Sequence, residues 1–246
     1  MSIFPKNHPF PVEAYFKSTT VLSFAVPKTE LGPLIPECLE LDTFDDTWGF
    51  IAMAMVQTKQ LRPKGFPKFL GNDFFLVGFR IFVRYQTSWG KRLRGLYILK
   101  SETNKKKMEL LGNIFTSYSY TTTDITHVND ANGFRIFSKK SDFNLVFENT
   151  AAEVTLPKSS PFSNWKEARR FAGPLPFTFS YNKPKNEVLI IEGVRSNWTP
   201  EPLHVVDHSI SFLNTLHLKE VKLANAFRIE EVPYQWKKGK KDQWKP

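Results

Sequence analysis

Arg80 stands in the middle of the apolar run FFLVGFRIFVRY, residues 74–85. A guanidinium in such a place needs a carboxylate, a group of carbonyls or water to offset its desolvation. Glu102 ends the next apolar run and is a candidate partner if the two runs pair as a hairpin. Arg80 is then either part of a structural ion pair or solvated outer face, or a clamp for a ligand carboxylate, to which arginine presents a planar fork.

The segment MELLGNIFTSYSYTTTDI, residues 108–125, places several hydroxyl groups close together. If it is a strand, alternate side chains point to opposite faces. One face would then carry Ile114, Thr116, Tyr118 and Tyr120, and the other Phe115, Ser117, Ser119 and Thr121. Either face would offer hydroxyls to a ligand, and the alternative is an ordinary half-solvated strand rich in β-forming residues.

Other combinations of reactive residues give little support for catalysis. His204 and His208 in HVVDH would share one face of a helix, as in zinc-binding helices, but Asp207 is misplaced for the usual base, so we expect structural histidines and no metal. The chain has no GxSxG, GxxxxGK or GxGxxG motif. Cys38 is the single cysteine and has no evident histidine partner, so a buried apolar role is expected. We expect no cofactor.

The formal net charge of +10 is concentrated in two short stretches, residues 105–107 and the tail 237–246. Neither stretch interleaves its lysines with stacking aromatics, so nucleic-acid binding is not expected, and the tail is expected to fray. The N-terminal residues lack the pattern of a secretory signal, and no segment has the roughly 18 to 20 apolar residues of a membrane span. We therefore expect a cytoplasmic protein that does not bind membranes.

Alternation of apolar residues is the dominant pattern. In residues 74–85 every odd position is apolar, which predicts a strand with one hydrophobic face and one face that carries Arg80 and Arg84. The turn residues between 85 and 93 and between 181 and 188 predict hairpins. The sequence thus favours a mainly β, antiparallel sheet or barrel. Further strands are predicted at 21–26, 48–58, 92–102, 143–149, 153–156, 177–182 and 187–195.

Few helices are predicted. The best covers SPFSNWKEARRFAGP, residues 160–174, with Ser160 as cap and Gly173 and Pro174 as its end. A shorter helix is expected within residues 27–36. No repeat or linker divides the chain, so a single domain over residues 1–246 is expected.

Several stretches together resemble a family. Residues 33–69, the strand pair 79–85 and 94–102, and LLGNIFTSYSY at 110–120 are similar to the uncharacterised YqjF-like family, a domain-of-unknown-function group related to acetoacetate decarboxylase. Residues 160–182, 194–202 and 223–239 follow in the expected order, and LRPKGFP at 61–67 is the most specific piece. The resemblance implies an acetoacetate decarboxylase-like, cone-shaped barrel or sandwich around an apolar pocket.

The resemblance also implies a Schiff-base lysine on the strand after a glycine-containing loop, with a glutamate nearby. By the order of the motifs the lysine belongs within residues 116–120 and the glutamate near Leu76, and neither residue type is there. Residues 105–107 are three lysines in a run that reads as a solvated turn, which lacks the desolvation that such a nucleophile needs. A Schiff-base decarboxylase is therefore disfavoured, and whether the protein is an enzyme is left open.

Two main hypotheses follow for the function, beside a less favoured third, an interaction protein whose basic tail, residues 237–246, binds anionic surfaces or RNA. The first is a barrel that binds a small, partly apolar metabolite, with a carboxylate end at Arg80 and Arg62. The second is a lyase or hydrolase of a small ketoacid that uses Tyr118 or Glu102 as acid or base, which requires a tyrosine pKa brought down toward neutrality. Related barrels often assemble, so a homo-oligomer is left open. The residues expected to bind the ligand are Arg80, Arg62, Thr116, Ser117, Tyr118 and Tyr120.

Overall fold

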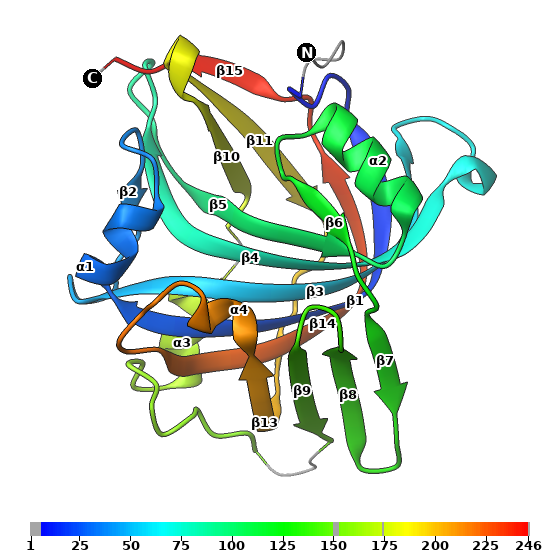
Figure 1. Cartoon of the computed structure of the whole chain (residues 1–246), viewed down its shortest axis with the longest axis vertical. Coiled ribbons are helices and arrows are strands. Elements are labelled where there is room, and N and C mark those ends of the chain that lie inside the picture. The colour runs from blue at the N-terminus through cyan, green and yellow to red at the C-terminus, as the bar shows by residue number, and fades with distance from the viewer. Residues whose placement is uncertain (1–5, 150–152, 174, 246) are drawn as a thin grey trace.

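A computed structural model of the chain describes residues 6–149, 153–173 and 175–245. Most of these residues belong to two β-sheets, and the larger one has eleven strands (Figure 1). No helix in the described part of the chain is long and apolar enough to cross a membrane. The strands of the larger sheet are β1 (Val12–Pro27), β2 (Glu40–Leu41), β3 (Trp48–Pro63), β4 (Asn72–Gln86), β5 (Arg92–Thr103), β6 (Tyr120–Thr122), β10 (Phe177–Asn182), β11 (Glu187–Arg195), β12 (Glu201–Pro202), β14 (Lys222–Trp236) and β15 (Lys240–Gln243).

The long strands of this sheet close into a ring. Strands β14, β1, β3, β4, β5, β10 and β11 are hydrogen-bonded in that order, and residues 193–195 of β11 pair again with β14. Neighbours in the ring are antiparallel except for β5 and β10, which run parallel at residues 95–97 and 177–179. A closed ring removes the unpaired edges of these strands and encloses a space between them. The fold is therefore mainly β, as predicted from the alternation.

Strand β4 shows how the alternating sequence builds two different faces. Its odd residues from Phe75 to Tyr85 are all buried in a hydrophobic core on the outer side of the ring. Its even residues include Arg80, Leu76 and Phe82, which face the enclosed space. The predicted division into an apolar face and an arginine-bearing face is confirmed.

A smaller sheet covers part of the outer face of the ring. It has four strands in the order β13 (His204–Ile210), β9 (Phe143–Glu148), β8 (Gly133–Ser138) and β7 (Thr126–Asn129), and Figure 1 shows it below the ring. Phe134, Leu145 and Phe147 pack into the same core as Met53 and Val77 of the ring. Burial of these side chains fixes the two sheets together, at about 1.5–3 kcal/mol for each large apolar side chain removed from water.

The two longer helices both pack on the ring. Helix α2 (Lys106–Phe115) packs on β6 and β5, and the N–H of His8 donates to the carbonyl of Phe115 at 2.9 Å. Helix α3 (Trp165–Phe171) brings Ala168 and Ala172 against Phe50 and Phe82 on the inner face of the ring. The shorter helical turns are α1 (Lys28–Leu31), η1 (Gly32–Leu34), η2 (Lys68–Leu70), η3 (Lys183–Lys185) and α4 (Ser211–Asn214).

Helix α2 corrects the interpretation of residues 108–125 as one strand. Only residues 120–122 are extended as β6, and the segment before them is helical. The helix buries Met108 and Gly112, which are four residues apart and therefore lie on one face. Lysines 105–107, expected in a turn, lead into the first turn of this helix. The hydroxyl-rich residues that follow the helix favour extended structure, so the helical spacing of Met108 and Gly112 is not evident from the sequence.

Other boundaries also differ from the expectations. The basic tail, expected to fray, forms β15, which pairs with β11. It is held there by Asp242, whose carboxylate accepts hydrogen bonds from Tyr85 at 2.7 Å and from the Ser88 N–H at 2.9 Å. Residues 153–156 are not a strand. The predicted hairpins at 85–93 and 181–188 and the turn of helix after Pro27 are confirmed.

Helix α3 is shorter than the predicted helix over residues 160–174. It begins at Trp165 because Asn164 caps it, with the side-chain oxygen accepting from the N–H of Glu167 at 3.0 Å. The side chain of Glu167 in turn accepts from the N–H of Ser163 at 2.7 Å, and the two bonds satisfy free N–H groups at the start of the helix. Pro174, which was expected to end this helix, lies outside the described residues.

Candidate functional site

A cavity of about 430 Å³ lies inside the ring. Every strand of the ring contributes side chains to its wall, and most of them are apolar. Helix α2 and residues 8–10 line one part of the wall, and residues 172, 173 and 175 line another. A cavity of this size suits a small-molecule ligand. Its polar wall residues include His8, Thr19, Thr58, Arg62, Asn72, Arg80, Ser101, Thr116, Tyr118, Tyr120, Thr178, Arg195, Trp198 and Tyr234.

Charge in this wall is of one sign. The described lining residues include Arg62, Arg80 and Arg195, but no aspartate, glutamate or lysine. Buried cations are normally paired, because removing a charge from water is costly. The cavity therefore has an excess of positive charge that its own wall does not neutralise.

Arg80 is the central cation of this wall. It lies on β4 opposite Ala52 of β3 and Ile98 of β5, and its guanidinium folds back over Gly78. A methyl group at position 78 would lie 3.2 Å from Nη2, so glycine gives the guanidinium its room. Among the described residues none forms an ion pair with Arg80, and burial lowers the pKa of its guanidinium.

Three tyrosines share the cavity wall with this guanidinium. Arg80 and the phenols of Tyr120, Tyr234 and Tyr118 affect one another's pKa values electrostatically. The rings of Tyr118 and Tyr120 lie 6.1 Å apart. Burial raises the pKa of Tyr120 to about 12, although Arg80 acts in the opposite direction. Burial also raises the pKa of Tyr118 and of Tyr234. All three phenols are therefore protonated at neutral pH and can donate a hydrogen bond.

Tyr120 is placed by residues of helix α2. The side-chain amide of Asn113 donates to the carbonyl of Tyr120 at 2.9 Å and accepts from its N–H at 2.7 Å. Gly112 lies under the aromatic ring, where any Cβ atom would overlap it. The glycine in LLGNIF therefore allows the tyrosine ring to pack against the helix.

Tyr234 is placed by β11 in a similar way. Its hydroxyl lies over Gly193, where a Cβ would overlap it. Its ring stacks on Phe16 with centroids 4.6 Å apart and packs against Trp236 at the same separation. Rings held on three sides keep one rotamer, so the direction of this phenol is fixed by packing.

The other expected ligand residues are placed differently. Thr116 lines the cavity, but its hydroxyl donates to the carbonyl of Gly112 at 2.8 Å at the end of α2. Ser117 is exposed, lies outside the cavity wall and donates to the carbonyl of Lys6 at 3.1 Å. The expectation that Ser117 lies in the pocket is therefore wrong, because the segment leaves a helix here and its side chains do not alternate as in a strand.

Arg62 lies in the cavity wall but is engaged by protein groups. It forms an ion pair of 2.7 Å with Glu13 on β1. Its guanidinium also donates to the carbonyls of Phe66 and Gln60, both at 2.8 Å. These bonds hold the β3–β4 loop closed, so Arg62 has little capacity left for a ligand.

Glu102 does not pair with Arg80. It lies opposite Val77 on the outer face of the ring, where Lys100 Nζ lies 2.8 Å from its carboxylate and the Ser141 hydroxyl donates to it at 2.6 Å. The hairpin between the two strands was predicted correctly, but the register and a bulge between Phe79 and Arg80 send the two side chains to opposite faces.

The described histidines and the cysteine form neither a metal site nor a reactive thiol centre. HVVDH forms strand β13, so His204 and His208 are not one turn of helix apart, and His204 Nδ1 lies 2.9 Å from Glu148. The described residues contain no group of three or more histidine, cysteine, aspartate or glutamate side chains that could hold a metal ion. Cys38 is buried, which raises the pKa of its thiol to about 12 and leaves it unreactive.

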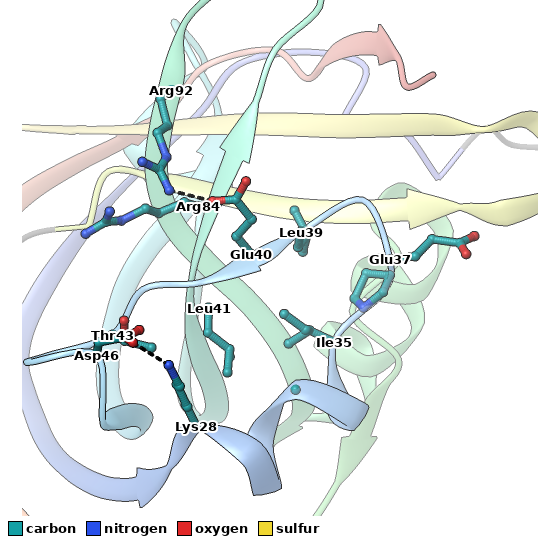
Figure 2. A pocket seen from close by; sticks show the side chains of 12 residues that line it. Lys28, Ile35, Glu37, Leu39, Glu40, Leu41, Thr43, Asp46, Arg84 and Arg92 are labelled. Atoms are coloured by element: carbon teal, nitrogen blue, oxygen red, sulfur yellow. Dashed lines mark hydrogen bonds and ion pairs between the residues drawn. The ribbon is translucent and has the colours of Figure 1, made fainter. Parts of the chain in front are cut away.

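A second depression, about 600 Å³, opens on the outside of the protein beside α1 and β2. Its charged side chains are largely paired with one another. Arg92 pairs with Glu40 at 2.5 Å and Lys28 with Asp46 at 2.6 Å (Figure 2). Because these pairs already satisfy the charges, this surface offers no unpaired cation comparable to Arg80.

The cavity wall contains further residues that the sequence did not indicate, among them His8, Arg195, Trp198 and Tyr234. Arg195 and Tyr234 are directly opposite one another on β11 and β14. Only that pairing, between strands far apart in sequence, brings them into the wall. The one available signal was Arg195 at the end of the predicted strand 187–195.

Comparisons with known proteins show the family of this chain and the fold that it shares with solved structures. A family model described as DUF2071, uncharacterized conserved protein (COG2071), matches residues 13–233. The chain belongs to this family. The resemblance stated from the sequence motifs is thereby confirmed, and no curated protein matches the DUF2071 chain.

Solved structures of acetoacetate decarboxylase-like enzymes share the fold of the DUF2071 chain. Acetoacetate decarboxylase from Legionella pneumophila has 10% sequence identity and a TM-score of 0.62, over 94% of this chain and 87% of that chain. An acetoacetate decarboxylase-like enzyme from Sphingomonas wittichii has 10% identity and a TM-score of 0.57, over 97% and 94%. The enduracididine biosynthesis enzyme MppR, solved with pyruvate, has 11% identity and a TM-score of 0.52, over 94% and 90%. At such identities the likeness shows the fold alone.

Proposed function

We propose that the protein binds a small, partly apolar carboxylic acid inside the ring, with the carboxylate at Arg80. The observation that carries the proposal is a guanidinium that lines the cavity without a carboxylate partner among the described residues, in a wall that contains no described acidic residue. A ligand carboxylate would accept two parallel hydrogen bonds from this guanidinium and offset the cost of burying its charge.

The tyrosines and the apolar wall support the same ligand class. Tyr118, Tyr120 and Tyr234 are protonated donors around Arg80, and a carboxylate has four lone-pair directions to accept from them. The rest of the wall, such as Phe16, Val56 and Phe82, would contact an apolar body. A few placed polar groups in an apolar chamber give orientation and specificity.

Binding in this proposal involves no Schiff base. The described wall contains no lysine, and an amine that adds to a ketoacid must lie next to the bound carbonyl. MppR has been solved with pyruvate, a small ketoacid, which is consistent with small acids as ligands of this fold.

The alternative, a lyase or hydrolase that uses Tyr118 or Glu102 as acid or base, has weaker support. Burial raises the pKa of Tyr118 away from neutrality, and Arg80 does not reverse this. Glu102 lies on the other face of the sheet. A tyrosine with a raised pKa stays protonated at neutral pH and is not available as a base there. Glu102 does not line the cavity, so neither residue meets the requirement of this mechanism.

Calorimetric titration with matched acids and amides tests the proposal. Octanoate and 3-phenylpropionate are compared with octanamide and 3-phenylpropanamide, which keep the apolar body and lose the charge. We expect at least one acid to bind the wild type at least tenfold more tightly than its amide, and Arg80→Gln to abolish that preference. Arg92→Gln, at an exposed pair outside the cavity, is the matched control and should behave as wild type. Acids that bind no better than their amides would refute the proposal.

A further inference from the structure

A second cation, Arg195, lies in the wall of the same cavity. It is the last residue of β11, and its guanidinium carbon lies 3.9 Å above the ring of Trp198. Among the described residues no carboxylate pairs with it, and burial lowers the pKa of its guanidinium. Stacking on an indole orients a guanidinium but leaves its in-plane N–H groups free to donate.

Trp198 adds a donor that lacks an acceptor. Its Nε1–H is buried and has no hydrogen-bond partner among the described residues. An indole N–H can only donate, as can a guanidinium, so neighbouring Arg195 and Trp198 form a site made entirely of donors. A buried donor without a partner is costly and rare, and a ligand with acceptor oxygens would accept from this N–H and from the guanidinium beside it.

Tyr234 links this site to Arg80. It lies directly opposite Arg195 in the β11–β14 pair, and its phenol responds to the charges of both arginines. The two cations therefore face one chamber from different strands, with a protonated phenol in the field of both. A ligand that reaches both arginines stays within the same cavity.

We propose that the cavity takes a ligand with two acidic groups, one bound at Arg80 and the other at Arg195 and Trp198. This inference rests on the proposed function, because it assigns the second end of the molecule bound at Arg80. The substrate or ligand class is then a dicarboxylic acid with an apolar middle section, and its chain length is set by the separation of the two arginines.

A series of straight-chain α,ω-dicarboxylates with four to twelve carbons, each compared with its monomethyl ester, tests the assignment by calorimetry. The ester keeps the chain and one carboxylate and loses the second charge. For the best chain length we expect the diacid to bind at least tenfold more tightly than its ester. Arg195→Gln should bring the diacid down to the affinity of the ester, and Trp198→Phe, which keeps the stacking and removes the N–H, should weaken the diacid about threefold to tenfold.

Controls separate this inference from the proposed function. Arg92→Gln should keep the wild-type preference for the diacid, and thermal melting of each variant checks that it is folded. A diacid preference that is absent at every chain length, or that survives Arg195→Gln in a folded protein, would overturn the two-acid assignment while leaving Arg80 as a single carboxylate site. Failure of both diacids and monoesters to bind the wild type would instead contradict the proposed function.

Discussion

Arg80 and Glu102 point to opposite faces of the same β4–β5 hairpin. Glu102 is opposite Val77 and pairs with Lys100 at 2.8 Å on the outer face, whereas Arg80 enters the cavity without a carboxylate partner among the described residues. A protein that needed Arg80 only for stability would gain from pairing it, because an unpaired buried charge is costly. The separation of these two residues therefore supports the proposal that a ligand supplies the carboxylate that Arg80 lacks.

Arg80→Met should increase the stability of the ligand-free protein. Removal of an unpaired buried guanidinium should raise the free energy of unfolding by about 1–3 kcal/mol, as happens when strained functional sites are relieved. Urea unfolding measures this change. The matched variant Arg62→Met, which leaves Glu13 without its partner at 2.7 Å, should lower stability by about 1–2 kcal/mol. A loss of stability in Arg80→Met comparable to that in Arg62→Met would show that Arg80 has protein partners.

Glu102→Gln should affect stability and not ligand binding. The carboxylate is almost fully buried beside Lys100 and Ser141, so neutralising it should lower the free energy of unfolding by about 1–3 kcal/mol. Affinity for the acid should equal that of the wild type, since the side chain lies outside the cavity. Glu40→Gln, in the exposed pair with Arg92, should change stability by less than about 0.5 kcal/mol. A large loss of affinity in Glu102→Gln would contradict the placement of this residue outside the binding site.

Much of the fold could be predicted from the sequence, because strand alternation is a local property. The division of β4 into an apolar outer face and an inner face with Arg80 followed directly from residues 74–85. Helix α2 was missed because the hydroxyl-rich residues after Phe115 suggested extended structure. Closure of the ring depends on β11 meeting β14, and no local pattern encodes a pairing between strands so far apart.

Only part of the candidate site could be predicted from the sequence. Arg80, Tyr118 and Tyr120 were expected in the pocket and line it. The proposed partnership of Arg80 with Glu102 failed because a bulge in the β4–β5 pair, invisible in the sequence, determines which side chains share a face. Arg195 and Tyr234 depend on the ring closure and could be recognised only from the structure.

Gly193→Ala should displace Tyr234. A Cβ at this position overlaps the phenol, whose ring is wedged against Phe16 and Trp236, so we expect a loss of about 1–3 kcal/mol in the free energy of unfolding and weaker acid binding. Gly32→Ala is the control, since a Cβ there meets no atom within 4 Å and φ is −50°. That variant should be neutral or slightly more stable. Equal stability of the two variants would show that the space over Gly193 is not required.

Acid should destabilise the fold from about pH 6.5 downward. Burial lowers the pKa of His8, His127 and His208, so the unfolded chain binds protons more readily than the folded protein, and stability falls as pH falls below the unfolded histidine value. Urea unfolding at pH 7.5 and 5.5 should show a smaller decrease for His127→Gln than for the wild type. His217→Asn, at an exposed residue with φ of 53°, should keep the wild-type decrease. Identical decreases for wild type and His127→Gln would contradict this assignment.

The most direct test of the account is a crystal structure with 3-(4-bromophenyl)propionate, in which anomalous scattering locates the bromine and density locates the carboxylate. We predict the bromophenyl ring inside the ring of strands and both carboxylate oxygens within hydrogen-bond distance of the Arg80 guanidinium. Bromine outside the cavity, or a carboxylate directed away from Arg80 toward solvent, would contradict the central claim that this unpaired arginine is a ligand site.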